Sequence, residues 1–293
     1  MPGLLIEPDD VCLYITEECN SNCIMCPMSE DSRKRGNSVP EEEWGAYLER
    51  IPKETKHITI TGGEPFLQYK QLIPFLPKLN LNNPDASILI LTNGRALAIP
   101  KIQQEIEPAI TERYCFAIPI HYSNQEVHDA ITQTNGSFQQ TMKALHFLER
   151  TKAKIEIRIV GTQLNIDHIS EVFQFLATSG IRITVINLIA MEVTGNAARE
   201  RKRLWVDYRE LYQKSKTGIR TAIEHGIDVG LYNFPLCALP EEVWPISRHS
   251  ITEWKVRFEN ECEECYVKDA CGGMFYSVQE LHLFHVKPFK GVM

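Results

Sequence analysis

Short runs rich in Val, Ile and Leu alternate along this sequence with longer segments of helical periodicity. Because parallel strands are joined by crossovers, usually helices, this alternation predicts a parallel sheet covered by helices. Strands are expected at residues 11–16, 57–61, 88–92, 115–120, 154–160 and 182–187. Helices are expected at 40–51, 69–79, 99–110, 137–149 and 166–178. Six such strand–helix units suit an incomplete α/β barrel.

The pattern changes near residue 228. The stretch 196–227 is helical and heavily charged, with a run of charges at 199–203 that is typical of a solvated helix face. Beyond it Pro235, Pro240 and Pro245 interrupt the helical periodicity, and four cysteines fall between Cys237 and Cys271. We therefore predict a barrel domain at 1–228 and a smaller cysteine-rich region at 229–293.

Composition narrows the class of protein. A chain of 293 residues that is 43% hydrophobic and 24% charged is ordinary for a soluble globular protein. A net charge of −7 argues against a strongly basic nucleic-acid binder, and neither a signal peptide nor a membrane span is read. Nine cysteines without an export signal predict a cytoplasmic location and favour metal or cluster ligation over disulfides.

Three of these cysteines form a tight group. Cys19, Cys23 and Cys26 have C-x3-C-x2-C spacing directly after the first expected strand. Three thiolates on one short loop can reach three corners of a cubane cluster and leave one iron open, as a catalytic centre requires. A zinc loop, which usually needs four ligands, and buried free cysteines are the alternatives.

This loop resembles the signature C-x3-C-x-aromatic-C of the radical S-adenosylmethionine (SAM) superfamily, with Met25 in place of the aromatic residue. The resemblance implies a partial (β/α)6 barrel with a cysteine-rich extension and a [4Fe-4S] cluster that binds SAM at its open iron. It also implies the activity: reductive cleavage of SAM to a 5′-deoxyadenosyl radical, which abstracts hydrogen from a substrate.

Two further segments fit this resemblance. Gly62, Gly63, Glu64 and Pro65 follow the second expected strand, where glycines permit a close backbone approach and a carboxylate can accept from an ammonium group. They resemble the GGEP motif that binds the SAM amino group. Thr92 and Asn93 precede Gly94 and resemble the TNG segment that lines the same site, although Asn-Gly alone is a common turn.

Later strand ends supply other candidates for SAM binding. By resemblance, these are Ser123 near the ribose, Arg158 for the carboxylate, Asn165 and Ile189, the last of these against the adenine. Arg158 lies within an apolar strand and needs an anionic partner, and a helix carboxylate on the outer face is the alternative. Ile189 also suits a plain core position.

A second group of cysteines follows the predicted boundary. Cys262, Cys265 and Cys271 have C-x2-C-x5-C spacing, and Cys237 lies upstream. Four thiolates accept either zinc or an iron-sulfur cluster. The region resembles the SPASM or twitch extension of radical SAM enzymes, which implies one auxiliary [4Fe-4S] cluster rather than zinc. Cys12 and Cys115 are expected to pack as small hydrophobes.

The substrate is predicted from the longest resemblance. Residues 19–27, 191–199, 232–240 and the final cysteines look like the radical SAM maturases of the His-Xaa-Ser repeat peptide system. This implies a ribosomally made peptide substrate, a companion maturase and a reductant protein such as a flavodoxin or ferredoxin. A purine-like or nucleoside substrate and a non-catalytic cluster scaffold remain as alternatives, because a shared fold does not identify a reaction.

Overall fold

The computed structural model describes residues 2–249 and 255–290. Within these ranges one sheet of nine strands follows the order of the chain, and β1 alone is antiparallel to its neighbour. Its strands are β1 (Gly3–Ile6), β2 (Asp10–Tyr14), β3 (His57–Thr61), β4 (Ser87–Leu91), β5 (Tyr114–Pro119), β6 (Lys154–Val160), β7 (Val185–Ile189), β8 (Asp228–Tyr232) and β9 (Ser247–Arg248).

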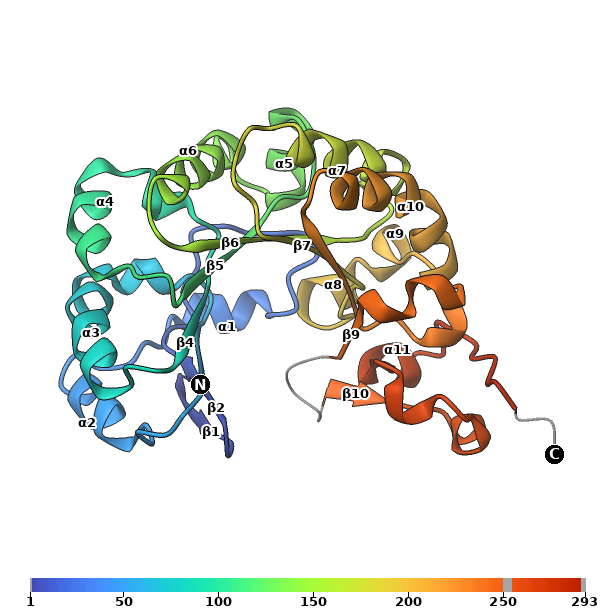
Figure 1. Ribbon diagram of the computed structural model, residues 1–293, viewed down its shortest axis with the longest axis horizontal. Coiled ribbons are helices and arrows are strands. Elements are labelled where there is room, and N and C mark those ends of the chain that lie inside the picture. The colour runs from blue at the N-terminus through green and yellow to red at the C-terminus, as the bar shows by residue number, and fades with distance from the viewer. Residues whose placement is uncertain (1, 250–254, 291–293) are drawn as a thin grey trace.

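Helices follow the strands, and most of them cover the convex side of the curved sheet (Figure 1). They are α1 (Glu30–Arg35), α2 (Glu43–Arg50), α3 (Tyr69–Asn82), α4 (Pro100–Ile106), α5 (Gln125–Thr132), α6 (Ser137–Glu149), α7 (Ile169–Ala177), α8 (Gly195–Arg199), α9 (Arg201–Leu204) and α10 (Tyr208–Glu224). A C-terminal unit adds β10 (Val256–Arg257), β11 (Met274–Phe275) and α11 (Tyr276–Glu280). The predicted α/β architecture with a partly closed barrel and a cysteine-rich extension is thereby confirmed.

The two faces of the sheet differ in burial. Alternate residues that face the helices, such as Ile58, Ile60 and Ile157, are fully buried and form the core. The intervening residues face the concave side, and many are only partly buried. Because side chains alternate across a strand, this period of two fixes which residues line the interior of the barrel. The parallel strands also bring the residues that follow them to one edge of the sheet.

Several sequence predictions need correction. The sixth predicted strand begins three residues later and ends two residues later than expected, at Val185–Ile189 instead of 182–187. The helical stretch 196–227 is divided into α8, α9 and α10. The sheet continues past the predicted boundary at 228, since β8 pairs with β7 and β9 pairs with β8. Gly230 makes β8 hard to recognise as a strand, because glycine is uncommon in strands. The structure requires glycine at this position, since a Cβ there would lie 2.3 Å from Asn187 Oδ1.

Cys12 and Cys115 also differ from expectation. Both lie on the concave face and are partly exposed instead of packed in the core, because the helices cover only the convex face. Burial raises the pKa of Cys115 to about 12, so its thiol stays protonated at neutral pH.

Candidate functional site

The first cysteine loop lies at the edge where the parallel strands end. It is held from outside by α5, since the backbone N–H groups of Asn22 and Ile24 donate to Thr132 and Ile131 at 3.1 and 3.0 Å. Within the loop, Cys26 N donates to Cys23 O at 3.1 Å and closes a turn. These backbone bonds give the three cysteines a fixed loop conformation without using their thiols.

The Gly-Gly-Glu segment packs directly against the chain that enters this loop. Gly63 N donates to Thr16 O and Glu64 N donates to Glu18 O, each at 2.7 Å. A Cβ on Gly63 would lie 2.1 Å from Glu18 O, so a side chain does not fit there. The sequence predicts a close approach to a ligand at these glycines, whereas the structure shows a close approach to the residues before Cys19.

Glu64 joins the ends of β3 and β4. Its carboxylate is fully buried and accepts from Phe66 N at 3.0 Å, Thr92 Oγ1 at 2.6 Å and Asn93 N at 2.7 Å. Burial raises the pKa of Glu64, and these three hydrogen bonds oppose that shift. Pro65, which is buried, begins the short 3-10 helix that supplies the Phe66 donor. The predicted Gly62–Pro65 and Thr92–Asn93 segments therefore meet at one point.

Asn93 extends this network to the cysteine loop. Its side-chain amide donates to Asn20 Oδ1 at 2.7 Å and lies 4.0 Å from Cys19 Sγ. Arg95 continues the contact, because its guanidinium donates to Asn20 O and, at 3.1 Å, to Ser21 Oγ. No role of their own was predicted for Asn20 and Arg95 from the sequence, because their contact exists only once the loop and the segment after β4 are brought together by folding.

The three thiols of the loop lie close enough to influence one another. Burial raises the pKa of Cys19 to about 11, and the neighbouring Glu64 and Cys26 add to this shift. Burial raises the pKa of Cys23 to about 12, and both other thiols contribute. Since a metal ligand must be the thiolate, the protons of these thiols have to be displaced by a positively charged metal centre.

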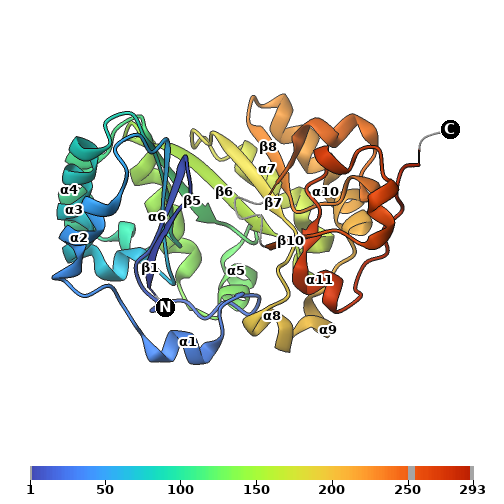
Figure 2. The same cartoon turned by 90° about the horizontal axis from the view of Figure 1, so that it is seen from below.

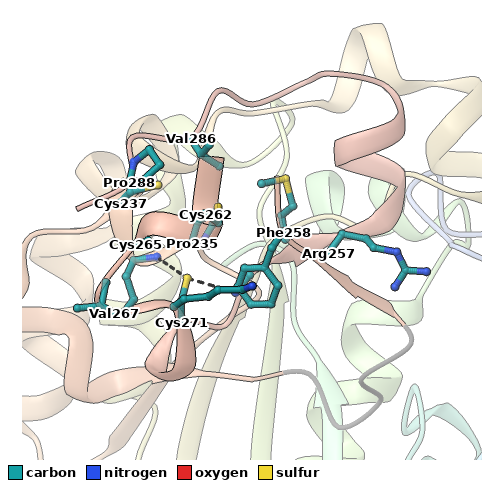
Figure 3. Close-up of a pocket in the computed structure, with 14 residues that line it drawn as sticks. Pro235, Cys237, Arg257, Phe258, Cys262, Cys265, Val267, Cys271, Val286 and Pro288 are labelled. Carbon is teal, nitrogen blue, oxygen red and sulfur yellow. Dashed lines mark hydrogen bonds between the residues drawn. The ribbon is translucent and has the colours of Figure 1, made fainter. Parts of the chain in front are cut away.

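The second cysteine group surrounds a pocket in the C-terminal unit. Figure 3 shows Cys237, Cys262, Cys265 and Cys271 around this pocket. Cys271 Sγ accepts from the backbone N–H groups of Leu236 and Gly273 at 3.3 and 3.4 Å. Cys237 Sγ accepts from the backbone N–H of Lys287 at 3.4 Å. The tertiary structure thus brings Cys237 to the three cysteines that follow it by 25 residues or more in sequence.

Electrostatic coupling supports this grouping. Burial raises the pKa of Cys262, and the other three thiols add to the shift. In the described ranges, no three His, Cys, Asp or Glu side chains are gathered tightly enough to hold a single metal ion. A cubane cluster takes its thiolates at separate corners and thus at wider spacing than a single ion does.

No helix of residues 2–249 and 255–290 has the length and apolarity of a membrane span.

The chain that carries this site was compared with known protein families. The model described as Radical SAM superfamily matches residues 13–176, from β2 into α7. The chain belongs to the radical SAM superfamily. Membership implies a [4Fe-4S] cluster and SAM, and it extends over the strand ends that carry the first cysteine loop, Glu64 and Asn93.

The relatives of this radical SAM protein carry the names of different enzymes. It is 24% identical to "AdoMet-dependent heme synthase" of Methanosarcina barkeri over 57% of this chain and 46% of that one. It is 26% identical to "Probable GTP 3',8-cyclase" of Pyrobaculum aerophilum over 76% of this chain and 69% of that one. The chain thus spans about half the length of the heme synthase relative.

Among solved structures, the radical SAM chain is similar in fold to SuiB of Streptococcus suis. With SuiB bound to S-adenosylmethionine, the TM-score is 0.63 at 16% identity, over 88% of this chain and 55% of that one. With SuiB bound to precursor peptide SuiA, the TM-score is 0.61 at 14% identity, over 78% and 49%. At such identities the likeness concerns the fold.

The structure also places the other residues predicted for SAM binding in this radical SAM chain. Met25 is buried in the core, and Ser123 is partly buried between β5 and α5. Asn165 is also buried, and its amide bonds go to the chain itself: Nδ2 donates to His121 O and Val160 O, and Oδ1 accepts from Thr162 N. These bonds tie together the ends of β5 and β6.

Arg158 and Ile189 line the concave face. Arg158 Nε donates to Glu156 Oε1 at 2.6 Å, so its anionic partner is a carboxylate two residues away on the same strand. This corrects the expected alternative of a helix carboxylate on the outer face, because Arg158 points away from the helices. Ile189 is partly exposed at the end of β7, opposite Val160 and Tyr232 in register.

Another segment, which belongs to the 191–199 stretch of the peptide-maturase resemblance, touches the cysteine loop of this radical SAM protein. Asn196 N donates to Cys26 O at 3.0 Å, and Asn196 Nδ2 donates to Cys23 O at 3.2 Å. Gly195, at φ +54°, allows this contact, since a Cβ there would lie 2.3 Å from Pro27 O. The sequence signal for this contact is the glycine itself, between Thr194 and Asn196, because glycine adopts positive φ without steric cost.

Proposed function

We propose that this chain is a radical SAM enzyme that modifies a ribosomally synthesised peptide. In this proposal Cys19, Cys23 and Cys26 hold the [4Fe-4S] cluster, and SAM binds beside them at the Gly62–Asn93 edge. The carrying observation is the continuous hydrogen-bond network from Glu64 through Asn93 to Asn20 in the cysteine loop. It fixes the loop relative to the strand ends, as a site for a cluster with one open iron requires.

The residues present fit these groups. Three thiols from one loop leave the fourth corner of a cubane free for SAM. When bound, cluster and SAM supply an electron and a sulfonium, from which a 5′-deoxyadenosyl radical arises. Glu64 orients the backbone of Asn93, and its buried negative charge favours a nearby ammonium group. Arg158 and Ile189 face the concave side, where a substrate would meet the radical carbon, and the helices exclude water from behind.

We further propose that Cys237, Cys262, Cys265 and Cys271 hold one auxiliary [4Fe-4S] cluster. Backbone N–H groups aimed at Cys237 Sγ and Cys271 Sγ support this, since hydrogen bonds to the ligand sulfurs are a common means of tuning such clusters. Zinc is the alternative occupant, because four thiolates also suit that ion.

A peptide substrate draws support from two directions. The sequence resembles the maturases of the His-Xaa-Ser repeat peptide system, and a fold neighbour is SuiB bound to precursor peptide SuiA. The relative named "Probable GTP 3',8-cyclase", which this chain matches over 76% of its length, favours a nucleotide as the second candidate.

The test begins with anaerobic reconstitution using iron and sulfide. 5′-Deoxyadenosine formed from SAM with dithionite is compared between wild type and the variant Cys19→Ala, Cys23→Ala, Cys26→Ala. Cys12→Ala is the matched control, since that cysteine lies on the concave face outside the loop. We expect cleavage by wild type and the control, and none by the triple variant.

Substrate choice is tested in the same reactions. A peptide with His-Xaa-Ser repeats and GTP are each added, and the products are analysed by mass spectrometry. A mass change of the peptide with faster 5′-deoxyadenosine formation supports the proposal, whereas turnover of GTP alone supports the second candidate. Absence of SAM cleavage by fully loaded wild type contradicts the enzymatic proposal and favours a non-catalytic scaffold.

A further inference from the structure

A strongly basic surface lies on the outer side of the first cysteine loop. We name it the basic face and define it by seven side chains of three short helices: Arg33, Lys34 and Arg35 of α1, Arg199 of α8, and Arg201, Lys202 and Arg203 of α9. All except the partly buried Arg33 are exposed. Figure 2 shows α1, α8 and α9 along one edge of the molecule.

Contacts between the helices make this a single surface. The Glu30 carboxylate of α1 forms ion pairs with Arg199 Nη2 of α8 at 3.4 Å and with Lys34 Nζ at 2.8 Å. Just before α8, Thr194 Oγ1 donates to Pro27 O at 3.1 Å. Glu30, Asp31 and Glu200 are the acidic residues of these helices and their junction. Glu17, outside these helices, also pairs with Arg35 at 3.9 Å. Seven basic against four acidic side chains still leave a local positive excess in a chain of net charge −7.

The basic face reaches the cysteine loop directly. Arg33 Nη2 donates to Asn22 Oδ1 at 2.6 Å, next to Cys23. A surface pocket is lined by Asn22 and Ile24 of the loop together with Arg199 and Arg203. A partner bound to this face therefore sits against the part of the loop that carries Asn22 and Ile24.

We propose that the basic face docks an acidic one-electron carrier protein, which delivers its electron through the segment Asn22–Cys23–Ile24. The carrier is oxidised by one electron, the centre held by the loop is reduced by one, and no bond or proton is exchanged. This rests on the proposed function for the identity of that centre. Transient electron-transfer partners use small interfaces, and charge complementarity raises their association rate.

A protein partner suits this surface better than a nucleic acid. The positive charge is confined to three short helices, whereas the rest of the chain carries the negative balance and repels an extended polyanion. A small acidic protein contacts the basic face without reaching the remaining surface.

The first experiment measures binding alone. Oxidised flavodoxin is titrated into the reconstituted protein by isothermal titration calorimetry at low and high salt. The variant Arg201→Glu, Lys202→Glu, Arg203→Glu is compared with a control of equal charge change, Lys152→Glu, Lys216→Glu, Arg220→Glu, whose positions are exposed elsewhere. We expect Kd to rise about tenfold or more in the basic-face variant and less than about twofold in the control, with weaker binding at high salt.

The second experiment separates docking from chemistry. 5′-Deoxyadenosine formation is measured with reduced flavodoxin and with dithionite, which needs no docking surface. We expect the basic-face variant to lose about tenfold with flavodoxin while its rate with dithionite stays within about twofold of wild type. A neutral variant, Arg201→Gln, Lys202→Gln, Arg203→Gln, gives an intermediate loss if charge is the cause.

Equal flavodoxin binding by both charge-reversal variants overturns the docking proposal. So does tight binding of poly(U) that the basic-face variant loses while flavodoxin shows no binding to wild type. Absence of SAM cleavage with dithionite rejects the proposed function instead, and the binding titration still tests the surface independently.

Discussion

The Glu64 carboxylate receives the backbone N–H of Asn93 at 2.7 Å and so ties the end of β3 to the end of β4. Asn93 in turn donates its side-chain amide to Asn20 in the cysteine loop. One buried carboxylate therefore controls the position of a backbone segment, a side chain and a loop that are far apart in sequence. Disturbing it affects both stability and the candidate site.

Glu64→Gln is expected to be destabilising although it conserves shape. One carboxylate oxygen becomes an NH2 group, which faces the donors of either Asn93 or Phe66 and leaves them unsatisfied. A buried unsatisfied group costs about 1–3 kcal/mol, and we expect the free energy of unfolding in urea to fall by that amount. Thr92→Ser keeps the hydroxyl and serves as control; a Glu64→Gln protein as stable as wild type contradicts this role.

Gly195→Ala is expected to loosen the cysteine loop. The new Cβ would collide with Pro27 O, and the residue also has φ +54°. Gly180→Ala is the matched control, since Gly180 has φ +75° with nothing within 4 Å and adds backbone strain alone. We expect Gly195→Ala to lose about 1–3 kcal/mol more than the control in the free energy of unfolding. Iron bound after reconstitution should also be lower; equal losses in both variants would contradict the packing argument.

Cys271→Ala is expected to empty the C-terminal site and leave the first one loaded. Its thiol accepts two backbone N–H groups and lies among the other three cysteines of the pocket. Reconstituted wild type should bind about eight irons per chain and the variant about four, if each site holds one cubane. Metal analysis and electron paramagnetic resonance report the change, with Cys115→Ala as control. Stoichiometric zinc in the wild-type protein, lost in the variant, would instead identify a zinc site.

Two buried histidines predict that acid destabilises the fold. Burial lowers the pKa of His121 to about 3 and that of His128 to about 4, from an ordinary 6.5. Between about pH 6.5 and 4 the unfolded chain binds these protons and the native chain does not, so stability falls as pH falls. Each histidine contributes a slope of about 1.4 kcal/mol per pH unit.

His121→Gln should therefore reduce this slope by about one proton, whatever it does to stability at pH 7. Urea unfolding at a series of pH values measures the slope. Phe116→Leu, a buried substitution without a titrating group, should leave the slope unchanged. An unaltered slope in His121→Gln would mean that His121 is protonated in the native protein.

Local patterns determined much of the architecture. Strands of Ile and Val such as His57–Thr61 and Lys154–Val160 were predicted at their observed bounds, since alternation of a buried face is a property of the residues themselves. The same holds for α6 (Ser137–Glu149). The spacing of Cys19, Cys23 and Cys26 likewise predicted one loop of three thiols, because short loops fix which side chains can converge.

Tertiary structure alone decided the rest. Arg158 pairs with Glu156 on the concave face, and Cys12 is partly exposed there, because the helices cover the other face. Asn165 donates its side-chain amide to backbone carbonyls that only the folded chain brings near it. β8, with its Asp and Gly, becomes a strand because β7 and β9 supply its partners. Whether a side chain is buried and which strand a strand pairs with depend on segments that folding brings together. The periodic pattern of one segment does not specify which other segments pack against it.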